Sequence, residues 1–502
     1  MEHSHPRVAE NHEAAEVDRI SIEEYGVASV ALMETAGSKT ADWLINHTNS
    51  DDLIGIVCGK GNNGGDALVC ARQIHASGRK VGVHMVMGDN NLSPDAQANY
   101  DILQTISRES GNITFYENLQ ELIQATPDWW VDGIFGTGLS SEVREPVATA
   151  IKKINQHPSP VLALDVPSGL DGTKGNVLGT TIFAHTTLMY GMGKLGAYIN
   201  AGPDYCGHRE IIPLGFTGPA LDKVSRGLIE SDPVLKEAKV GSRFSHKYEA
   251  GIVYLFAGSG GMTGAAVMAA KAAWSVGAGG VVIFCPAGLL QVYEQLVPEA
   301  VKIPLGSAND SRFKPAHLEQ ALEKVKTRHP HVVLAGPGAG DHHETLDFFA
   351  QLLEKFSGKL IFDADAFSVF GKSNSNRADS QQLIVTPHRG EFARAKSPDA
   401  RDDYSLLIEG ENFASQNNLT LLLKGEPTLV TDSKKTLITA YPTHYYSRFG
   451  FGDVLAGMIA ANFLHKNEMN ACVSAMVTGN MRLQKIISKK TGHPAQPSDL
   501  IL

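Results

Sequence analysis

Cysteine is scarce in this chain, which holds only five cysteines among 502 residues. They are scattered, and no two of them form a CxxC pair. This pattern indicates neither a zinc site nor a disulfide framework. Free thiols are typical of a reducing compartment, so we expect a cytoplasmic protein.

Long apolar runs and an excess of positive charge are also missing. No run of about 18 apolar residues occurs, so no membrane span is expected. Residues 1–6 lack the basic and apolar regions of a signal peptide. The formal net charge of −10 gives no reason to expect nucleic acid or an anionic membrane as a partner. The phosphate-binding string GxxxxGK[ST] is absent too.

Glycine, in contrast, is abundant, with 50 residues, many of which follow predicted strands. Enzymes of the α/β class place their ligand loops at such positions. Hydrophobic residues make up 43% and charged residues 20% of the chain, as in a soluble globular protein. A chain of this length is too long for one core, so we expect at least two domains.

The first half alternates short apolar segments with helical ones. Strands are predicted at 53–58, 81–87, 129–134, 161–165 and 187–190, and helices at 22–36, 67–77 and 94–108. Such alternation is typical of βαβ units and predicts a doubly wound, mainly parallel sheet.

The second half has an α/β pattern of its own. A polar, weakly periodic stretch near 216–245 predicts domains at 1–220 and 241–502, joined by a linker at 221–240. Strands are predicted at 251–256, 281–285, 332–334, 360–362, 383–385, 419–423 and 428–430, and a small-residue helix at 265–276. A last helix at 453–464 is apolar nearly all round and should be buried. The halves share no motif, so the chain is predicted to be a fusion of two different domains.

The most informative stretch is CGKGNNGGD at 58–66, between a predicted strand and a predicted helix. A glycine-rich turn lets the backbone approach a ligand, and a helix N-terminus favours anions. The two asparagines and the aspartate would suit a ribose, a phosphate or a hard cation. The alternative is a structural turn with asparagine in left-handed conformation.

Two further loops, DGIFGTG at 132–138 and DVPSG at 165–169, also lie at predicted strand ends. We expect Asp66, Asp132 and Asp165 to converge in one cleft, where oxygen donors would suit a group I or II cation. Taken alone, each aspartate could equally be a turn or cap residue.

These loops, together with METAG at 33–37, resemble the signature loops of the NAD(P)H-hydrate epimerases over about residues 10–215. The resemblance implies a Rossmann-like domain that interconverts the R and S forms of hydrated NADH and NADPH, with bound potassium. By position it implies potassium ligands at Asn63, Asp132 and Ser168, and Asp165 is the candidate acid–base residue. The implied dinucleotide contacts are Asn62, Asn63, Gly64, Gly65, Asp66, Gly136, Thr137, Gly138, Leu139, Ser140, Ser141, Glu142 and Asp165.

One residue departs from this family pattern. A glycine usually follows the aspartate of the first loop, and here Ala67 takes its place. A left-handed backbone would cost an alanine about 1 kcal/mol, whereas a helical one costs nothing. Because Ala67 begins the apolar periodic stretch, we expect it to open the helix.

In the second half, RFGFGD at 448–453 opens the buried helix. Backbone amides at a glycine-rich helix start can bind a phosphoryl group, and Asp453 can accept a proton from a hydroxyl. Phosphoryl transfer needs little more than positioning and a divalent ion. The alternative is an ordinary N-cap aspartate. Four more loops follow predicted strands: GPGAG at 336–340, DADA at 363–366, TPHRGE at 386–391 and KG at 424–425.

This second set resembles the ADP/ATP-dependent NAD(P)H-hydrate dehydratases, which have a ribokinase-like fold, from about His246 to the C-terminus. The resemblance implies that the hydroxyl of the hydrate is phosphorylated with Asp453 as base, after which phosphate is eliminated. Magnesium and ADP are the expected cofactors, ADP because fused two-domain forms resemble the ADP-using bacterial branch. The implied hydrate contacts are Ala265, Gly338, His388 and Asp453, and the implied nucleotide contacts are Lys424, Gly425, Glu426, Pro427, Thr428 and Gly452.

Phe451 departs from the second family pattern, because serine or threonine usually stands between the two glycines. A hydroxyl donor to phosphate is therefore lost. We expect a small effect, since backbone amides carry most of the anion site.

The sequence thus predicts a bifunctional repair enzyme for NADHX and NADPHX, the hydrated forms of NADH and NADPH, and we expect a homo-oligomer, a tetramer or larger. Two alternatives stay open. One is a ribokinase-like small-molecule kinase, and the other is a first domain that only binds a ligand.

Overall fold

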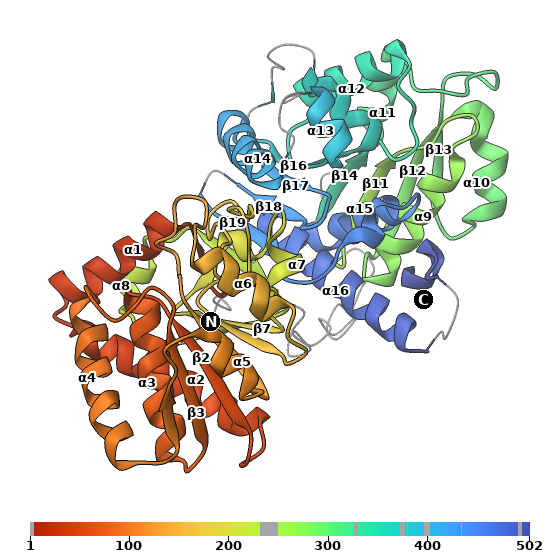
Figure 1. The fold of residues 1–502 in the computed structure, drawn as a ribbon. Helices are drawn as coiled ribbons and strands as arrows, with labels where there is room; N and C mark the ends of the chain where they lie inside the picture. Colours follow the sequence, from red (N-terminus) through yellow and green to blue (C-terminus); the bar gives the residue numbers. More distant parts are fainter. Residues whose placement is uncertain are drawn as a thin grey trace. The chain divides into compact units, whose positions relative to one another are not determined.

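The computed structural model describes residues 5–230, 249–325, 330–371, 377–378, 380–395, 402–432, 434–489 and 494–501. The chain divides into two compact units, Met1–Arg226 and Gly227–Leu502. Both are α/β units, coloured red to yellow and green to blue in Figure 1. The predicted linker lies outside the described residues from 231 on, as does the start of the second resemblance at His246. No helix in the described ranges has the length and apolar content needed to cross a bilayer.

The first unit is built on a parallel seven-stranded sheet in the order β4-β3-β2-β5-β6-β7-β9. The strands are β2 (Leu53–Cys58), β3 (Lys80–Met85), β4 (Ile113–Phe115), β5 (Trp129–Gly133), β6 (Val161–Leu164), β7 (Thr186–Tyr190) and β9 (His208–Ile212). The chain runs outward from β2 in one direction and from β5 in the other. The carboxyl ends of β2 and β5 therefore flank a topological switch point, where ligands bind in such sheets.

Helices cover both faces of this sheet because its strands are apolar on both sides. Ile54 and Ile56 of β2 pack with the α2, α3 and α4 side, whereas Val57 packs with α5 and α6. The helices are α1 (Asn11–Arg19), α2 (Ser29–His47), α3 (Asn62–Ala76), α4 (Pro94–Glu109), α5 (Leu119–Gln124), α6 (Val147–Asn155), α7 (Gly202–Cys206) and α8 (Gly218–Leu221). Outside the main sheet, β1 (Val8–Ala9) pairs with β8 (Gly193–Lys194).

One helix prediction in this unit is wrong. Residues 22–36 do not form a single helix: a π-helical turn at Ile20–Glu24 ends before Gly26, and α2 then runs from Ser29 to His47. Gly26 has φ of +73°, a left-handed backbone that interrupts the helix.

The second unit has a ten-stranded sheet in the order β10-β19-β18-β17-β16-β15-β14-β11-β12-β13. Its strands are β10 (Arg226–Ile229), β11 (Ile252–Phe256), β12 (Gly280–Pro286), β13 (Val301–Leu305), β14 (His331–Ala335), β15 (Lys359–Asp363), β16 (Gln382–Thr386), β17 (Thr420–Leu423), β18 (Leu429–Thr431) and β19 (Thr436–Thr439). The strands from β17 to β13 are parallel, and β18 and β19 add antiparallel pairs. Strand β10 falls within the predicted linker, and only two of its four residues, Leu228 and Ile229, are aliphatic.

Two layers of helices enclose the second sheet. The helices are α9 (Thr263–Ser275), α10 (Leu290–Leu296), α11 (Leu318–Lys324), α12 (His343–Lys355), α13 (Arg389–Ala395), α14 (Asp403–Asn417), α15 (Phe451–Phe463) and α16 (Glu468–Lys489). Helix α15 is buried nearly all round, as predicted, and packs against α9 (Figure 1). It is not the last helix, because α16 follows it and contributes to the same core.

Candidate functional site

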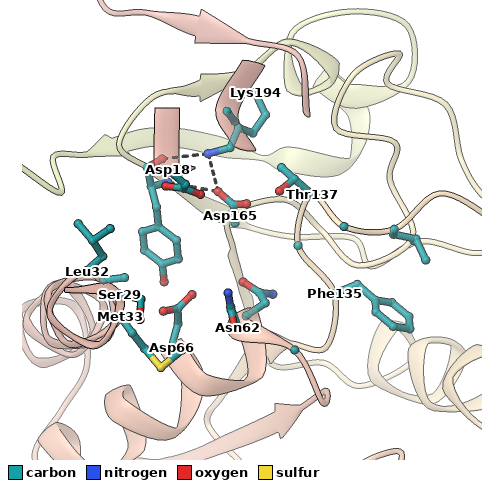
Figure 2. Close-up of a pocket in the computed structure, with 18 of the residues that line it drawn as sticks. Asp18, Ser29, Leu32, Met33, Asn62, Asp66, Phe135, Thr137, Asp165 and Lys194 are labelled. Carbon is teal, nitrogen blue, oxygen red and sulfur yellow. Dashed lines mark hydrogen bonds and ion pairs between the residues drawn. The ribbon is translucent and has the colours of Figure 1, made fainter. Parts of the chain in front are cut away.

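A cavity of about 720 Å³ opens at the carboxyl ends of β2, β5, β6 and β7 in the first unit. Figure 2 shows its wall, with Asn62 and Asp66 on one side, Asp165 and Lys194 opposite, and Leu32 and Met33 of α2 at the edge. The lining combines apolar side chains with amide, hydroxyl and carboxyl groups. A few polar groups in a largely apolar hollow are typical of a small-molecule site.

The first predicted loop is helical rather than an open turn. Helix α3 begins at Asn62 with Gly61 as its N-cap, so residues 62–66 form its first turns. A Cβ on Gly64 would lie 2.2 Å from the carbonyl oxygen of Gly59, and one on Gly65 would lie 2.5 Å from Met33 Cε. These two glycines therefore allow close packing beneath the cavity, and neither is among the residues that line it.

Ala67 lies inside this helix and is fully buried. A Cβ on Gly133 would approach Ala67 Cβ to 2.4 Å, so the helix and β5 are in tight contact here. The expectation that Ala67 is helical is confirmed. The expectation that Ala67 opens the helix is wrong, because the helix begins five residues earlier, at Asn62.

Asn63 presents unused hydrogen-bonding capacity to the cavity. The residue is 9% exposed, and within the described part of the chain neither its side-chain amide nitrogen nor its side-chain oxygen has a partner. A Cβ on Gly136 would lie 3.5 Å from Asn63 Cγ and 3.3 Å from Asp165 Oδ2. An unsatisfied buried amide is costly, so this position favours a bound polar ligand or ion.

Asp132 does not join the other two aspartates in the cavity wall, and that part of the predicted convergence is wrong. Its carboxylate is 1% exposed and accepts bonds from Ser168 Oγ at 2.6 Å, Ser168 N at 2.8 Å and Ile134 N at 3.2 Å. Burial raises the pKa of Asp132 to about 6, although the bonds from Ser168 oppose this shift. Asp132 thus ties the β5 loop to the β6 loop, and Phe135 N donates to Ser168 Oγ at 2.8 Å.

Asp165 does face the cavity. It has φ of +67°, a left-handed conformation in which aspartate is enriched among non-glycine residues. Its Oδ1 lies 2.6 Å from Lys194 Nζ, and Tyr190 N donates to the same oxygen at 3.4 Å. Figure 2 shows this ion pair at the upper side of the cavity.

Asp66 supplies a second carboxyl group to the same cavity. Burial, with added repulsion from the carboxylates of Asp165 and Asp18, raises the pKa of Asp66 well above its usual value. Burial and Asp66 likewise raise the pKa of Tyr190, whose hydroxyl bonds Thr40 Oγ1 at 2.7 Å. A carboxyl group with a raised pKa lying across a cavity from a second carboxyl group can give a proton on one side of a ligand while the second takes one on the other.

Most of the predicted dinucleotide contacts of the first unit line this cavity. Those that do are Asn62, Asn63, Asp66, Gly136, Thr137, Gly138, Leu139, Ser140, Ser141 and Asp165, whereas Gly64, Gly65 and Glu142 do not. Sequence reasoning missed several lining residues, among them Asp18, Ser29, Leu32, Tyr190 and Lys194. Asp18, Ser29 and Leu32 lie in no glycine-rich loop. Lys194 does lie in one, GMGKLG at 191–196, which directly follows the predicted strand ending at Tyr190, and this signal was not used.

The candidate site of the second unit lies at the start of α15. Gly450 is the N-cap with φ of +87°, a conformation that favours glycine, and Asp453 lies in the first turn. Asp453 is half-buried, and burial together with the Asp363 carboxylate raises its pKa to about 7. A carboxyl group with that pKa is suited to accept a proton near neutral pH.

A buried ion pair stands beside this helix start. Lys424 Nζ lies 2.7 Å from Asp363 Oδ1, and a Cβ on Gly452 would lie 3.2 Å from the same nitrogen. Burial opposes the charged form of Lys424, but the carboxylates of Asp363 and Glu391 raise its pKa above the usual value. Thr386 Oγ1 donates to Asp363 Oδ1 at 2.6 Å.

The loops around this pair bring several predicted residues together. Lys424 N donates to Pro387 O at 2.9 Å, so the β16 and β17 loops run side by side. His388 is half-exposed, and its Nδ1 accepts from Glu391 N at 3.1 Å. The 425–428 turn is closed by Thr428 Oγ1, which donates to Gly425 O at 2.9 Å, and Glu426 and Pro427 are joined by a cis peptide.

Gly338 and Ala265 meet on the other side of the sheet end. A Cβ on Gly338 would lie 2.8 Å from Ala265 Cβ. Nearby, Gly340 N donates to Asp365 Oδ2 at 2.7 Å. Burial raises the pKa of Asp365, and its carboxyl group in turn raises that of Asp453.

Replacing Lys424 by methionine is expected to destabilise the second unit by about 3–5 kcal/mol, because Asp363, 1% exposed, would be left as an unpaired buried charge. Denaturant unfolding followed by circular dichroism measures this loss. Lys355→Met, on the exposed end of α12, is the matched control and should change little. Equal stability of the two variants would contradict the buried pair.

The side chain of Phe451 lies in the core of the second unit. It is 1% exposed and packs in the core with Val454 and Leu455. We expect Phe451→Thr to cost about 3–5 kcal/mol of unfolding free energy through the cavity it leaves. Phe449 is 103% exposed, so Phe449→Thr is the control and should cost less than about 0.5 kcal/mol. Urea unfolding compares the two, and equal losses would show that Phe451 is not a core residue.

Known proteins resemble both halves of the chain. Residues 29–196 match the family described as YjeF-related protein N-terminus, and residues 253–500 match the family described as NAD(P)H-hydrate dehydratase. Among solved structures, an ADP/ATP-dependent NAD(P)H-hydrate dehydratase from Bacillus subtilis, co-crystallised with ATP and Mg²⁺, is 21% identical. The match covers 53% of this chain and 92% of that one, with a TM-score of 0.44.

Curated relatives match nearly the whole chain. The bifunctional NAD(P)H-hydrate repair enzyme Nnr of Salinibacter ruber is 31% identical over 93% of this chain and 90% of its own length. That of Coxiella burnetii is 31% identical over 90% of this chain and 88% of its own. Identity at this level over nine-tenths of both proteins shows that the chain belongs to the family of bifunctional NAD(P)H-hydrate repair enzymes.

Proposed function

We propose that the first unit interconverts the R and S forms of hydrated NADH and NADPH, and that the second dehydrates the S form with ADP, giving AMP and phosphate. Family membership over nearly the full length of the chain supports both activities. The observation that carries the assignment of steps is chemical. The first cavity holds paired carboxyl groups, and the second site places a carboxyl group of raised pKa at a glycine-rich helix start.

Epimerisation requires that the hydroxyl group leave one face of the ring and return to the other. Water adds to an enamine at the carbon bonded to nitrogen, so the hydroxyl group of the hydrate stands on that carbon. Once this hydroxyl group is protonated, the lone pair of the ring nitrogen can expel it as water. In our proposal Asp66 gives this proton, the C–O bond breaks, and water leaves a C=N⁺ bond behind. Water then adds to the opposite face, and its proton passes to Asp165. A proton exchange between the two carboxyl groups restores the site.

We propose that Asn63, Asp132 and Ser168 hold the potassium ion. The unpartnered Asn63 amide oxygen fits such an ion, and carboxylate and hydroxyl oxygens are suitable hard donors. Among the described residues no three His, Cys, Asp or Glu side chains gather as a metal site, so amide and hydroxyl oxygens would have to contribute. When bound, potassium would supply positive charge near the substrate.

In the second unit, Asp453 would take the proton of the substrate hydroxyl as its oxygen attacks the terminal phosphorus of ADP. The backbone N–H groups of residues 450–453 would donate hydrogen bonds to the transferred phosphoryl group and stabilise its negative charge. The phosphoanhydride bond of ADP breaks in the same step and AMP leaves. Loss of phosphate from the carbon bonded to the ring nitrogen, with loss of a proton from the adjacent ring carbon to water, then restores the C=C bond of the dihydronicotinamide. Magnesium would neutralise the phosphates of the nucleotide when bound.

We propose the remaining contacts of the second site from the loops that meet there. Ala265, Gly338 and His388 would contact the hydrate, and Lys424, Gly425, Glu426, Pro427, Thr428 and Gly452 would contact the adenine nucleotide. The neighbouring Lys424 ammonium and Gly452 backbone support a shared anion site. We further propose a homo-oligomer, a tetramer or larger, in the cytoplasm. Light scattering of the purified protein measures the first, and imaging of a tagged chain the second.

A recovery assay tests the proposed function. Mixed hydrate epimers of NADH are incubated with the enzyme and either ADP or ATP, and the return of dihydronicotinamide absorbance is followed. Full recovery with ADP is the expected result. Recovery that stalls once the S form is consumed would overturn the epimerase activity, and no recovery with either nucleotide would overturn the dehydratase activity.

A further inference from the structure

Lys194 stands out among the cavity residues because its ammonium group is already fully used. Its side chain is 4% exposed, and its Nζ lies 2.6 Å from Asp165 Oδ1. The same nitrogen donates to Tyr190 O at 2.9 Å and to Met192 O at 3.1 Å. A lysine ammonium has three N–H donors, so none is left for a ligand. Lys194 is thus built to hold protein groups in place.

The group it holds is the carboxylate of Asp165. Oδ1 is occupied by Lys194 and by Tyr190 N, whereas Oδ2 lies 3.3 Å from where a Cβ on Gly136 would stand. Gly136 lines the cavity, so Oδ2, which has no hydrogen-bond partner among the described residues, is the oxygen beside the ligand space (Figure 2). The left-handed backbone of Asp165 adds a reason for a clamp, since such a conformation persists only where its surroundings enforce it.

Strands outside the seven-stranded sheet fix the position of Lys194. It ends β8, which pairs with β1 in a register that sets Ala9 opposite Lys194. Helix α1 follows β1 and brings Asp18 to the same cavity. Residues 8–18 precede the segment at 29–196 that matches the family, so part of the support for this site comes from outside that segment.

Lys194 is also the only cationic residue among those that line the cavity in the described part of the chain. It faces three carboxyl groups, Asp18, Asp66 and Asp165, and bonds directly to one of them. The favourable ion pair therefore selects which carboxylate is fixed.

We propose that Lys194 is a positioning residue of the epimerase site: it fixes the Asp165 carboxylate with Oδ2 turned toward the substrate. This inference rests on the proposed role of Asp165. Misplacement of a reacting group by about 1 Å costs roughly 10²-fold in rate. Loss of the clamp should therefore lower kcat for epimerisation about 10²-fold and leave KM for the hydrate nearly unchanged.

A double-mutant cycle tests this proposal on the full-length enzyme. Epimer exchange of NADH hydrate, without nucleotide, is followed chromatographically for Lys194→Met, Asp165→Asn and the double variant. If Lys194 acts through Asp165, adding Lys194→Met to Asp165→Asn causes no further loss. Additive losses would overturn the proposal, as would a Lys194→Met variant of normal kcat. If Asp165→Asn itself is fully active, the proposed acid–base role fails instead.

Two further measurements separate positioning from simple unfolding. Lys80→Met removes an exposed lysine at the start of β3 and should leave epimerisation unchanged. Lys194→Ala opens space beside the cavity, so added ethylammonium should restore part of the lost kcat, whereas equal tetramethylammonium, which has no N–H donor, should not. A folded Lys194→Ala variant whose kcat neither ion changes would contradict the clamp. Dehydration of pure S hydrate with ADP reports in each variant that the second unit is intact.

Discussion

Replacing Asp453 by asparagine is expected to lower dehydration of the S hydrate by about 10³-fold while leaving epimer exchange unchanged. General-base catalysis contributes roughly 10²–10⁴-fold, and asparagine keeps the shape of the side chain but cannot take the proton. Since burial and Asp363 raise the pKa of Asp453 to about 7, the base is lost as pH falls through that value. The wild-type kcat/KM should therefore rise with pH and level off above about 7.

The measurement is the initial rate at which dihydronicotinamide absorbance rises, with varied concentrations of pure S hydrate and saturating ADP, between pH 5.5 and 8.5. Asp347→Asn, on the exposed face of α12, is the matched control and should retain both the rate and the pH profile. If the Asp453→Asn enzyme keeps most of its activity, the general base must be a residue other than Asp453. A profile flat from pH 5.5 upward would show that Asp453 is ionised throughout and that its environment differs from the one described.

The strands of both sheets were largely predictable from the sequence because buried parallel strands are short apolar runs between glycine-rich turns. Strand β2 begins and ends where the pattern of residues 53–58 places it. Strand β10 was not predictable, since its four residues include an arginine and a glycine, and pairing with β19 is what makes them a strand. The start of α3 was missed because Gly64 and Gly65 are typical of a turn rather than of a helix. Here the first turns of the helix need them, since a Cβ at either position would clash with neighbouring atoms.

The candidate site was predictable only where chemistry lies in short loops. Asp66 and Asp165 follow strands and could be assigned to one sheet edge, and both line the cavity. Asp132 carries the same signal, yet its bonds to Ser168 hold it in the interior. Asp18 could not be found, because a short helix outside the main sheet places it there. Lys194 was missed although glycines at 191, 193 and 196 surround it after a predicted strand, because its place in the site depends on the two-residue strand β8.

Replacing Asp165 by asparagine is expected to slow epimer exchange by about 10²–10⁴-fold without affecting dehydration of pure S hydrate. Asparagine tolerates the left-handed backbone of this position and can still accept a bond from Lys194, so the fold should survive. What it cannot do is take up the proton of the returning water. With mixed epimers and excess ADP, recovery should stop once the S form is consumed and then proceed only at the spontaneous rate.

Glu16→Gln is a suitable control, since it neutralises an exposed carboxylate on α1 that pairs with Arg19. It should give full recovery at the wild-type rate. A stronger test mixes the Asp165→Asn and Asp453→Asn proteins in one tube. Each variant would then carry one intact site, and S hydrate released by one chain could be consumed by the other. Full recovery by the mixture, with neither variant alone achieving it, would assign the two steps to separate residues. A mixture that also stalls would contradict that division of labour.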